Sequence, residues 1–179
     1  MKRTLLLTCL SALILTIQAQ TNYYTETKIF YENGYTYQCY VEAKWVDLYN
    51  KNYTTYAHGR VTQVFKDTGE TFYLLHYERV AQMYDNDETR ENGKNKVRAI
   101  LAPYKSILKD KELLMKFVIN SDTGKIDEVY FGFTQIGPYA QLPISVFREM
   151  ELSLIGTQFK LTDFGKRLNY LYMWWAVAP

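Results

Sequence analysis

The sequence has few of the residues that most often carry out chemistry in proteins. Its 179 residues include only two histidines and two cysteines. Cys9 lies in an apolar N-terminal stretch, so Cys39 has no partner for a disulfide in the rest of the chain. Two histidines and one cysteine are also too few to bind zinc without the help of carboxylates. We therefore expect a fold that is stabilised by its core alone, with no metal ion and no other cofactor.

No motif indicates a catalytic nucleophile. No serine lies in a Gly-x-Ser-x-Gly motif, the sharp turn that exposes the nucleophile of many hydrolases. Cys39 could pair with His58 or His76 as nucleophile and base, but no third group is spaced to orient them, and Cys39 falls on an inward-facing strand position. Asp-Thr-Gly occurs at residues 67–69 and 122–124, as in aspartic proteases, yet turn composition explains both copies. The sequence therefore assigns no catalytic, cofactor-binding or metal-binding residue.

Long hydrophobic runs are absent apart from one at the N-terminus. The run over residues 5–17 follows Lys2 and Arg3 and is too short for a membrane-spanning helix, which takes about 20 residues. A basic start, a short apolar run and a small residue at Ala19 are the three parts of a secretory signal. We predict that residues 1–19 are a signal peptide and that the protein is exported, to the periplasm, the cell surface or the medium.

No excess of one charge remains after removal of the signal peptide. The formal net charge is +2 for the whole sequence and falls to 0 without Lys2 and Arg3. A neutral chain lacks the concentrated positive field that releases counterions from phosphate, so nucleic-acid binding is not expected. The oxygen-rich run at residues 85–88 lacks the regular alternation of a calcium-binding loop. It lies in the polar segment Tyr84–Lys96, which we interpret as a solvated loop.

Aromatic residues, in contrast, are abundant at 16% of the sequence. A typical two-residue turn, Asn33-Gly34, follows a predicted strand at Thr27–Phe30. Beyond this turn, alternating apolar residues predict one long strand, Tyr35–Tyr49, with Cys39 and Trp45 on the same face. The same signals predict two further hairpins and a last strand. These are Arg60–Lys66 with Thr71–Arg79, Leu113–Ile119 with Lys125–Phe133, and Arg167–Val177.

The clearest helix signal lies at Pro143–Ile155. Proline suits the first position of a helix, and Gly156 suits the residue just after its end. Apolar residues recur at a spacing of three to four from Ile144 to Leu154, which predicts a stripe facing the core. Either Met150 or Glu151 completes this stripe, and Glu151 is expected to belong with the other charged residues of this helix mainly to the solvent side.

These elements predict an α+β fold, in which antiparallel β-hairpins form a sheet and one or two helices pack on it. A second, shorter helix is expected within Val97–Leu108, where Pro103 either divides it into two pieces or leaves it partly extended. Residues 20–179 have the length of a single domain. They can be subdivided into a hairpin-rich half, 20–110, and a C-terminal β-hairpin–helix–strand half, 111–179.

The C-terminal half contains the hairpin FVINSDTGKIDEVYF, the helix after Pro143 and the strand GKRLNYLYMWWAV. This order of hairpin, helix and strand resembles the C-terminal domain of TonB-type proteins. The resemblance implies a sheet-plus-helix fold and contact with a protein partner through an edge strand. TonB itself has a proline-rich spacer, whereas this chain has four prolines, so energy transduction is not implied. The whole chain, with its Gln-Thr-Asn mature start and tyrosine-rich strands, also resembles a family of uncharacterised secreted proteins of Gram-negative gut bacteria.

Aromatic residues near strand ends and loops are the remaining sign of function, because exposed rings stack on sugars or anchor protein partners. The candidate contact residues are Tyr49, Tyr53, Tyr56 and Trp175. We therefore expect a non-enzymatic exported protein of the cell envelope that binds a protein or a glycan through aromatic or edge-strand surface. The alternative is a small polymer-degrading hydrolase with a carboxylate pair that one sequence does not reveal.

Overall fold

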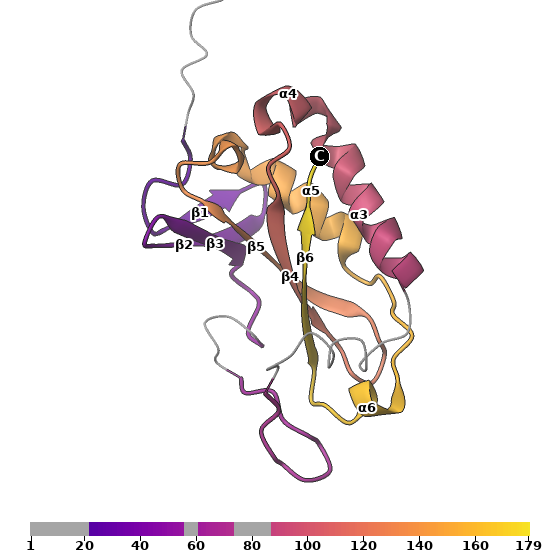
Figure 1. Ribbon diagram of the computed structural model, residues 1–179. Helices are drawn as coiled ribbons and strands as arrows, with labels where there is room; N and C mark the ends of the chain where they lie inside the picture. Colours follow the sequence, from indigo (N-terminus) through magenta and orange to yellow (C-terminus); the bar gives the residue numbers. More distant parts are fainter. Residues whose placement is uncertain (1–21, 56–60, 74–86) are drawn as a thin grey trace, which may run out of the picture.

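The computed structural model describes residues 22–55, 61–73 and 87–179 (Figure 1). Six antiparallel strands form one sheet in the order β1-β2-β3-β5-β4-β6. The strands are β1 (Lys28–Glu32), β2 (Tyr35–Glu42), β3 (Trp45–Asn50), β4 (Leu113–Ile119), β5 (Ile126–Thr134) and β6 (Leu171–Val177). The α-helices are α3 (Asp87–Leu101), α4 (Lys105–Leu108), α5 (Ile144–Leu154) and α6 (Asp163–Lys166), and short 3-10 helices lie at η2 (Ala102–Tyr104) and η3 (Pro138–Gln141). The fold is therefore α+β, as the sequence predicts.

The predicted C-terminal unit of hairpin, helix and strand is confirmed; the bounds of the hairpin strands and the helix agree within one residue, whereas the last strand begins at Leu171 rather than Arg167. Strands β4 and β5 pair around the turn that contains Gly124, and α5 and then β6 follow. Gly124 has a φ of +74°, and a Cβ at this position would lie 2.3 Å from the carbonyl oxygen of Phe159. Glycine is therefore required here for its backbone conformation and for the close approach of a second chain segment.

The predicted long strand over residues 35–49 is wrong, because the chain turns back at Ala43-Lys44. Both residues have positive φ, 48° and 66°, and they connect β2 to β3 as a two-residue hairpin turn. Alanine and lysine are not typical of such turns, and the alternation of apolar residues continues across them. The sequence therefore shows no sign of a turn here. Trp45 pairs with Glu42 and thus lies on the face opposite to that of Cys39, which is buried as expected.

The predicted loop over Tyr84–Lys96 is also wrong for residues 87–96, which form most of α3. The helix is rich in Glu, Lys and Arg, which favour helix formation, and Glu91 lies 3.4 Å from Lys94 one turn further on. On the side of α3 that faces the sheet, one contact is made by a glycine, Gly93. A Cβ on Gly93 would lie 2.8 Å from the ring of Trp175, so the helix backbone packs directly against β6.

Two other expectations are met only in part. The second hairpin, expected at Arg60–Lys66 and Thr71–Arg79, is reduced to a single bridge between Val64 and Thr71, and its residues 60 and 74–79 lie outside the described part of the chain. The expected helix over Val97–Leu108 consists of the end of α3, then η2 at Pro103, then α4. Proline therefore divides the helix into two pieces, the first of the two alternatives that the sequence allowed.

Helices α3 and α5 lie side by side on one face of the sheet (Figure 1). Phe147 of α5 contacts Phe131 and Phe133 of β5, with ring centroids 5.2 Å apart in both pairs. Phe117 and Trp175 pack together further along the same face at 4.3 Å. This layer of aromatic and aliphatic side chains is the main core, and burial of this apolar area supplies most of the driving force for folding. Within the described residues, no helix combines the length and the apolar character that are needed to cross a membrane.

Candidate functional site

The sheet face turned away from α3 and α5, here called the second face, carries a different set of aromatic residues. Side chains of successive strand residues alternate between the faces, and residues paired across antiparallel strands share a face. The strand register therefore assigns the second face its members. They are Trp45, Asp47 and Tyr49 of β3, Tyr130 and Gly132 of β5, Leu114, Lys116 and Val118 of β4, and Tyr172, Trp174 and Ala176 of β6.

One end of the second face is covered by a cluster of tyrosines. Tyr49, Tyr130 and Tyr170 are buried there, and Tyr53, from the segment after β3, packs on Tyr130 with ring centroids 5.7 Å apart. The Tyr170 hydroxyl donates a hydrogen bond of 2.8 Å to the carbonyl oxygen of Val61. These contacts close this end of the face with the chain's own segments and leave little ring surface for a ligand.

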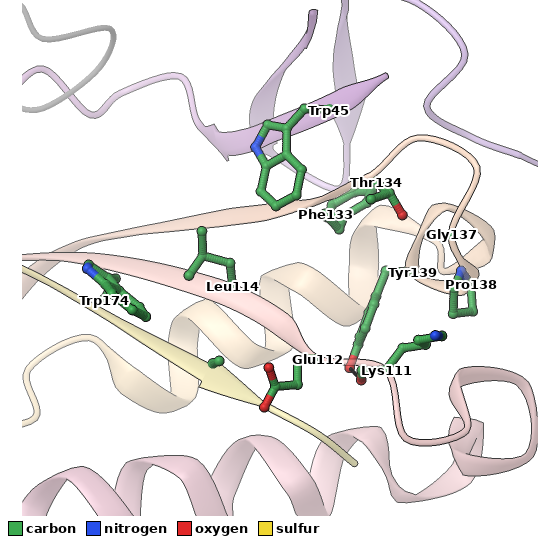
Figure 2. A pocket seen from close by; sticks show the side chains of 11 residues that line it. Trp45, Lys111, Glu112, Leu114, Phe133, Thr134, Gly137, Pro138, Tyr139 and Trp174 are labelled. Carbon is green, nitrogen blue, oxygen red and sulfur yellow. Dashed lines mark hydrogen bonds between the residues drawn. The ribbon is translucent and has the colours of Figure 1, made fainter. Parts of the chain in front are cut away.

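The other end of the second face is open and forms a groove, here called the tryptophan groove (Figure 2). Its volume is about 520 Å³. Trp45 and Trp174 lie on two sides of Leu114, and Pro138 and Lys111 lie at the end away from Trp174 (Figure 2). The remaining lining residues are Glu112, Phe133, Thr134, Gly137, Tyr139 and Ala176.

The two indoles of the groove are held differently. Trp45 lies across Gly132 of the neighbouring strand, where a Cβ would come within 2.7 Å of its ring. Its Nε1 donates a hydrogen bond of 3.3 Å to Asp47, and Asp47 forms an ion pair of 2.6 Å with Lys116. Trp174 is paired with Lys116 across the strands and remains 45% exposed. The groove thus presents one fixed and one exposed aromatic ring on either side of an apolar floor.

The structure separates the four aromatic residues that the sequence singled out. Tyr49 and Tyr53 are brought together in the tyrosine cluster, where Tyr49 is buried. Trp175 is buried on the helix-covered face against Phe117. Tyr56 lies outside the described residues. A contact of these residues with a ligand stays a prediction, but the exposed rings of the sheet belong to other positions.

Sequence reasoning missed Trp45 and Trp174 as site residues, although part of the signal was present. Alternation in β6 places Leu171, Met173 and Trp175 on one face and Trp174 on the other. What the sequence did not indicate is which of these two faces the helices cover. For Trp45, the unrecognised turn at Ala43-Lys44 assigned the indole to the wrong face.

A buried carboxyl group, Glu151, lies on the helix-covered side and is a second unusual feature. The sequence places it on the solvent side of α5, but its side chain is buried and accepts hydrogen bonds from four side chains. Arg148 Nη1 donates at 2.7 Å and Asn50 Nδ2 at 3.1 Å. The hydroxyls of Tyr37 and Tyr53 donate the other two hydrogen bonds. Arg148 lies on the same helix, but helical periodicity alone could not reveal the other three partners, which come from β2, β3 and the segment after β3.

The environment of Glu151 favours its neutral form. Burial raises the pKa of this carboxyl from 4.5 to about 8. Arg148 acts in the opposite direction, because a positive charge nearby favours the ionised carboxylate, but burial is the larger effect. A tyrosine hydroxyl can accept as well as donate, so the O–H of the neutral carboxyl can donate a hydrogen bond to Tyr37 or Tyr53. Glu151 thereby ties the end of β3 to α5.

Glu128 is a second buried carboxylate, on the other face of the sheet. One of its oxygens accepts hydrogen bonds of 3.0 Å from the backbone N–H groups of Thr54 and Thr55, and the other accepts one of 2.6 Å from the Tyr130 hydroxyl. Glu128 and Glu151 therefore hold the segment after β3 from both sides. Neither lines the tryptophan groove, so they do not form the paired carboxylates of a glycosidase cleft.

Cysteine and metal chemistry find no support in the described residues. Burial raises the pKa of the Cys39 thiol to about 11, so the nucleophilic thiolate is scarce near neutral pH. His58 and His76, the proposed bases, lie outside the described part of the chain. No group of three or more His, Cys, Asp or Glu side chains in residues 22–55, 61–73 and 87–179 is arranged to hold a metal ion.

Comparison with known proteins identifies a family and a similar solved structure. A family model described as "Domain of unknown function (DUF5043)" matches residues 20–175. The crystal structure of a DUF5043 family protein from Bacteroides uniformis ATCC 8492 is similar, with a TM-score of 0.78 and 31% sequence identity. This match covers 89% of this chain and 89% of that chain. No curated protein matches the sequence significantly. The relation to a bacterial protein family that the sequence suggests is thus confirmed, whereas export and the TonB-type resemblance stay predictions.

Proposed function

The chain belongs to the DUF5043 family, and we propose that it is an exported binding protein that holds an oligosaccharide in the tryptophan groove. The observation that carries this proposal is the placement of Trp45 and Trp174 on either side of Leu114, on the sheet face opposite to the one that α3 and α5 cover. Large rings held on rigid strands bind a flat partner at little cost in conformational entropy.

The chemistry of the groove fits a carbohydrate. One face of a sugar ring carries mainly C–H groups and stacks on an aromatic ring, while its hydroxyls form hydrogen bonds at the edges. The groove supplies both kinds of contact, with indoles and Leu114 inside and with Thr134 and Glu112 among its polar lining residues. Its volume of about 520 Å³ lies within the usual range for small-ligand sites, about 300–1,000 Å³.

The groove supports binding without cleavage. Hydrolysis of a glycosidic bond normally takes two carboxyl groups on opposite sides of the bond. Glu112 is the one acidic residue among the described residues that line the groove. Asp47 lies nearby but is engaged in its ion pair with Lys116. A binding role therefore fits this site better than the hydrolase alternative.

Calorimetric titration of purified residues 20–179 tests the proposed function. The probes are maltohexaose, xylohexaose, hexagalacturonate and a sulfated chondroitin hexasaccharide, with a mixed-sequence hexapeptide for comparison. We expect at least one saccharide to bind saturably with a Kd below about 1 mM, a free energy of roughly 4 kcal/mol. The proposal is wrong if no saccharide binds, or if the peptide binds more tightly than all four saccharides.

Substitution of Gly132 tests how the groove holds its tryptophan. Gly132 does not line the groove, but a Cβ at this position would lie 2.7 Å from the Trp45 ring. We expect Gly132→Ala to displace the indole and to weaken saccharide binding about three- to tenfold, the loss of roughly 1 kcal/mol of ring contact. The control is the same substitution in a Trp45→Ala protein, where no further loss is expected. An equal additional loss there would show that Gly132 does not act through Trp45.

Export is supported by the N-terminal sequence and by the family match, which begins at residue 20, directly after the predicted cleavage site. We expect the protein recovered from the periplasm or the medium of expressing bacteria to start at Gln20. N-terminal sequencing measures this directly. A protein that stays in the cytoplasm with Met1 intact would contradict the proposal.

A further inference from the structure

A second depression continues the tryptophan groove at the end away from Trp174. Its volume is about 480 Å³, and it shares Lys111 and Pro138 with the groove. Its other lining residues come from α4, the residue after α4, and the turn that holds η3. They are Ser106, Ile107, Leu108, Lys109, Ile136 and Gln141. Because the two depressions share walls, one ligand of several units can occupy both.

Charge is distributed unevenly along these two depressions. In the tryptophan groove Lys111 is accompanied by Glu112, whereas the second depression is lined by Lys109 and Lys111 with no acidic residue among its described lining. Both lysines are exposed, and neither forms an ion pair with another described residue. Asp110, between them in sequence, lines neither depression. The second depression therefore offers two lysine side chains that form no ion pair within the described part of the chain.

The backbone that carries the two lysines is fixed. The Lys109 N–H donates a hydrogen bond of 2.8 Å to the carbonyl oxygen of Lys105, and Lys109 has a φ of 52°. The carbonyl oxygen of Lys111 accepts a hydrogen bond of 2.9 Å from the Tyr139 hydroxyl. The two side chains thus start from fixed points beside the apolar walls formed by Ile107 and Ile136.

We infer that the ligand is an acidic oligosaccharide, whose anionic groups lie against Lys109 and Lys111 while its rings contact Trp45 and Trp174. This inference rests on the proposed function of the groove and adds the charge and the minimum length of the ligand. Lysine acts as a compact positive charge, so it binds either a carboxylate or a sulfate group. Uronic acids and sulfated sugars share this anionic chemistry.

Matched acidic and neutral ligands test the inference. Hexagalacturonate is compared with its fully methyl-esterified form, which keeps the sugar rings and removes the charge, and the sulfated chondroitin hexasaccharide tests the sulfate source. We expect an acidic ligand to bind at least about tenfold more tightly than the neutral one, with a preference that shrinks as salt is raised. Lys109→Ala/Lys111→Ala should remove this preference, so that the acidic and the neutral ligand bind with equal affinity. Lys105→Ala is the matched control, since Lys105 lies on α4 but lines neither depression.

The outcomes separate this inference from the proposed function. Equal binding of the acidic and neutral saccharides would overturn the inference and leave saccharide binding in the tryptophan groove intact. If the Lys109→Ala/Lys111→Ala variant still prefers the acidic ligand, the anionic groups of that ligand do not lie against Lys109 and Lys111. Absence of binding by every saccharide, with tight binding of a poly-glutamate peptide, would overturn both proposals and assign the surface to a protein partner.

Discussion

Replacing Glu151 with alanine is expected to lower the free energy of unfolding by roughly 3 kcal/mol or more. The substitution removes the shared partner of Tyr37, Asn50, Tyr53 and Arg148 and leaves a cavity between α5 and the sheet. Each buried donor left without a partner costs about 1–3 kcal/mol, although water entering the cavity recovers part of this loss. Urea unfolding measures the change. Glu149→Ala is the control on the same helix, because Glu149 is exposed and its removal should change stability by less than about 0.5 kcal/mol.

The pH dependence of stability gives a second test of the same carboxyl group. The folded protein holds a proton on Glu151 up to a pKa of about 8, whereas the unfolded chain releases it near the ordinary value of 4.5. Between these values the folded state binds more protons than the unfolded state, so stability falls as the pH rises from about 4.5 to 8. Glu151→Gln resembles the neutral carboxyl in shape and should remove this part of the slope. If the slope is the same in both proteins, Glu151 is ionised in the folded state and the stated pKa shift is wrong.

Replacing Trp45 and Trp174 together with alanine is expected to weaken saccharide binding by at least about 30-fold. Each indole supplies a ring face at the groove, and loss of such a contact at the centre of a site costs roughly 1–2 kcal/mol. Both side chains lie on strands at partly exposed positions of the second face, so the main core on the opposite face stays intact. Calorimetric titration with the saccharide that binds the unaltered protein measures the loss.

The control for this pair is Tyr73→Ala. Tyr73 is 62% exposed and does not line either depression, so its removal should leave affinity unchanged. A near-ultraviolet circular dichroism spectrum confirms that the double tryptophan variant is folded. A folded double variant that binds the saccharide as tightly as the unaltered protein would move the binding site away from the second face.

Local signals in the sequence were sufficient for the C-terminal half of the fold. The β4–β5 hairpin was predictable because its turn contains Asp-Thr-Gly and its strands consist of apolar and β-branched residues. Helix α5 was predictable because Pro143 and Gly156 flank a regular apolar stripe. In both cases residues close together in sequence determine the structure.

The errors arise where contacts between distant segments decide the structure. Helix α3 has few apolar residues, and its close packing depends on Gly93 lying against Trp175, 82 positions away. Ala43 and Lys44 adopt positive φ although neither is glycine or asparagine. The pairing of β2 with β3 holds this turn conformation in place. Glu151 is buried because its partners come from three other parts of the chain. Periodicity within a segment contains none of this information.

The candidate site depends on the same long-range information. The sequence indicated aromatic residues as the functional signal and singled out Trp175 rather than its neighbour Trp174. Choosing between these two required knowledge of which sheet face α3 and α5 cover. The groove itself joins β3, β4, β5, β6 and η3, which come from widely separated parts of the sequence.

Binding of a saccharide in the tryptophan groove is tested most directly by NMR, through the indole N–H signals of the three tryptophans. In a ¹⁵N-labelled protein each tryptophan gives one such signal, which is assigned by replacing Trp45, Trp174 and Trp175 in turn with phenylalanine. Trp175 is an internal control, because it is buried on the helix-covered face of the sheet. We expect titration with the bound saccharide to shift the signals of Trp45 and Trp174 and to leave that of Trp175 in place. A saccharide that binds without moving Trp45 or Trp174, or that moves Trp175 alone, would contradict a binding site in the tryptophan groove.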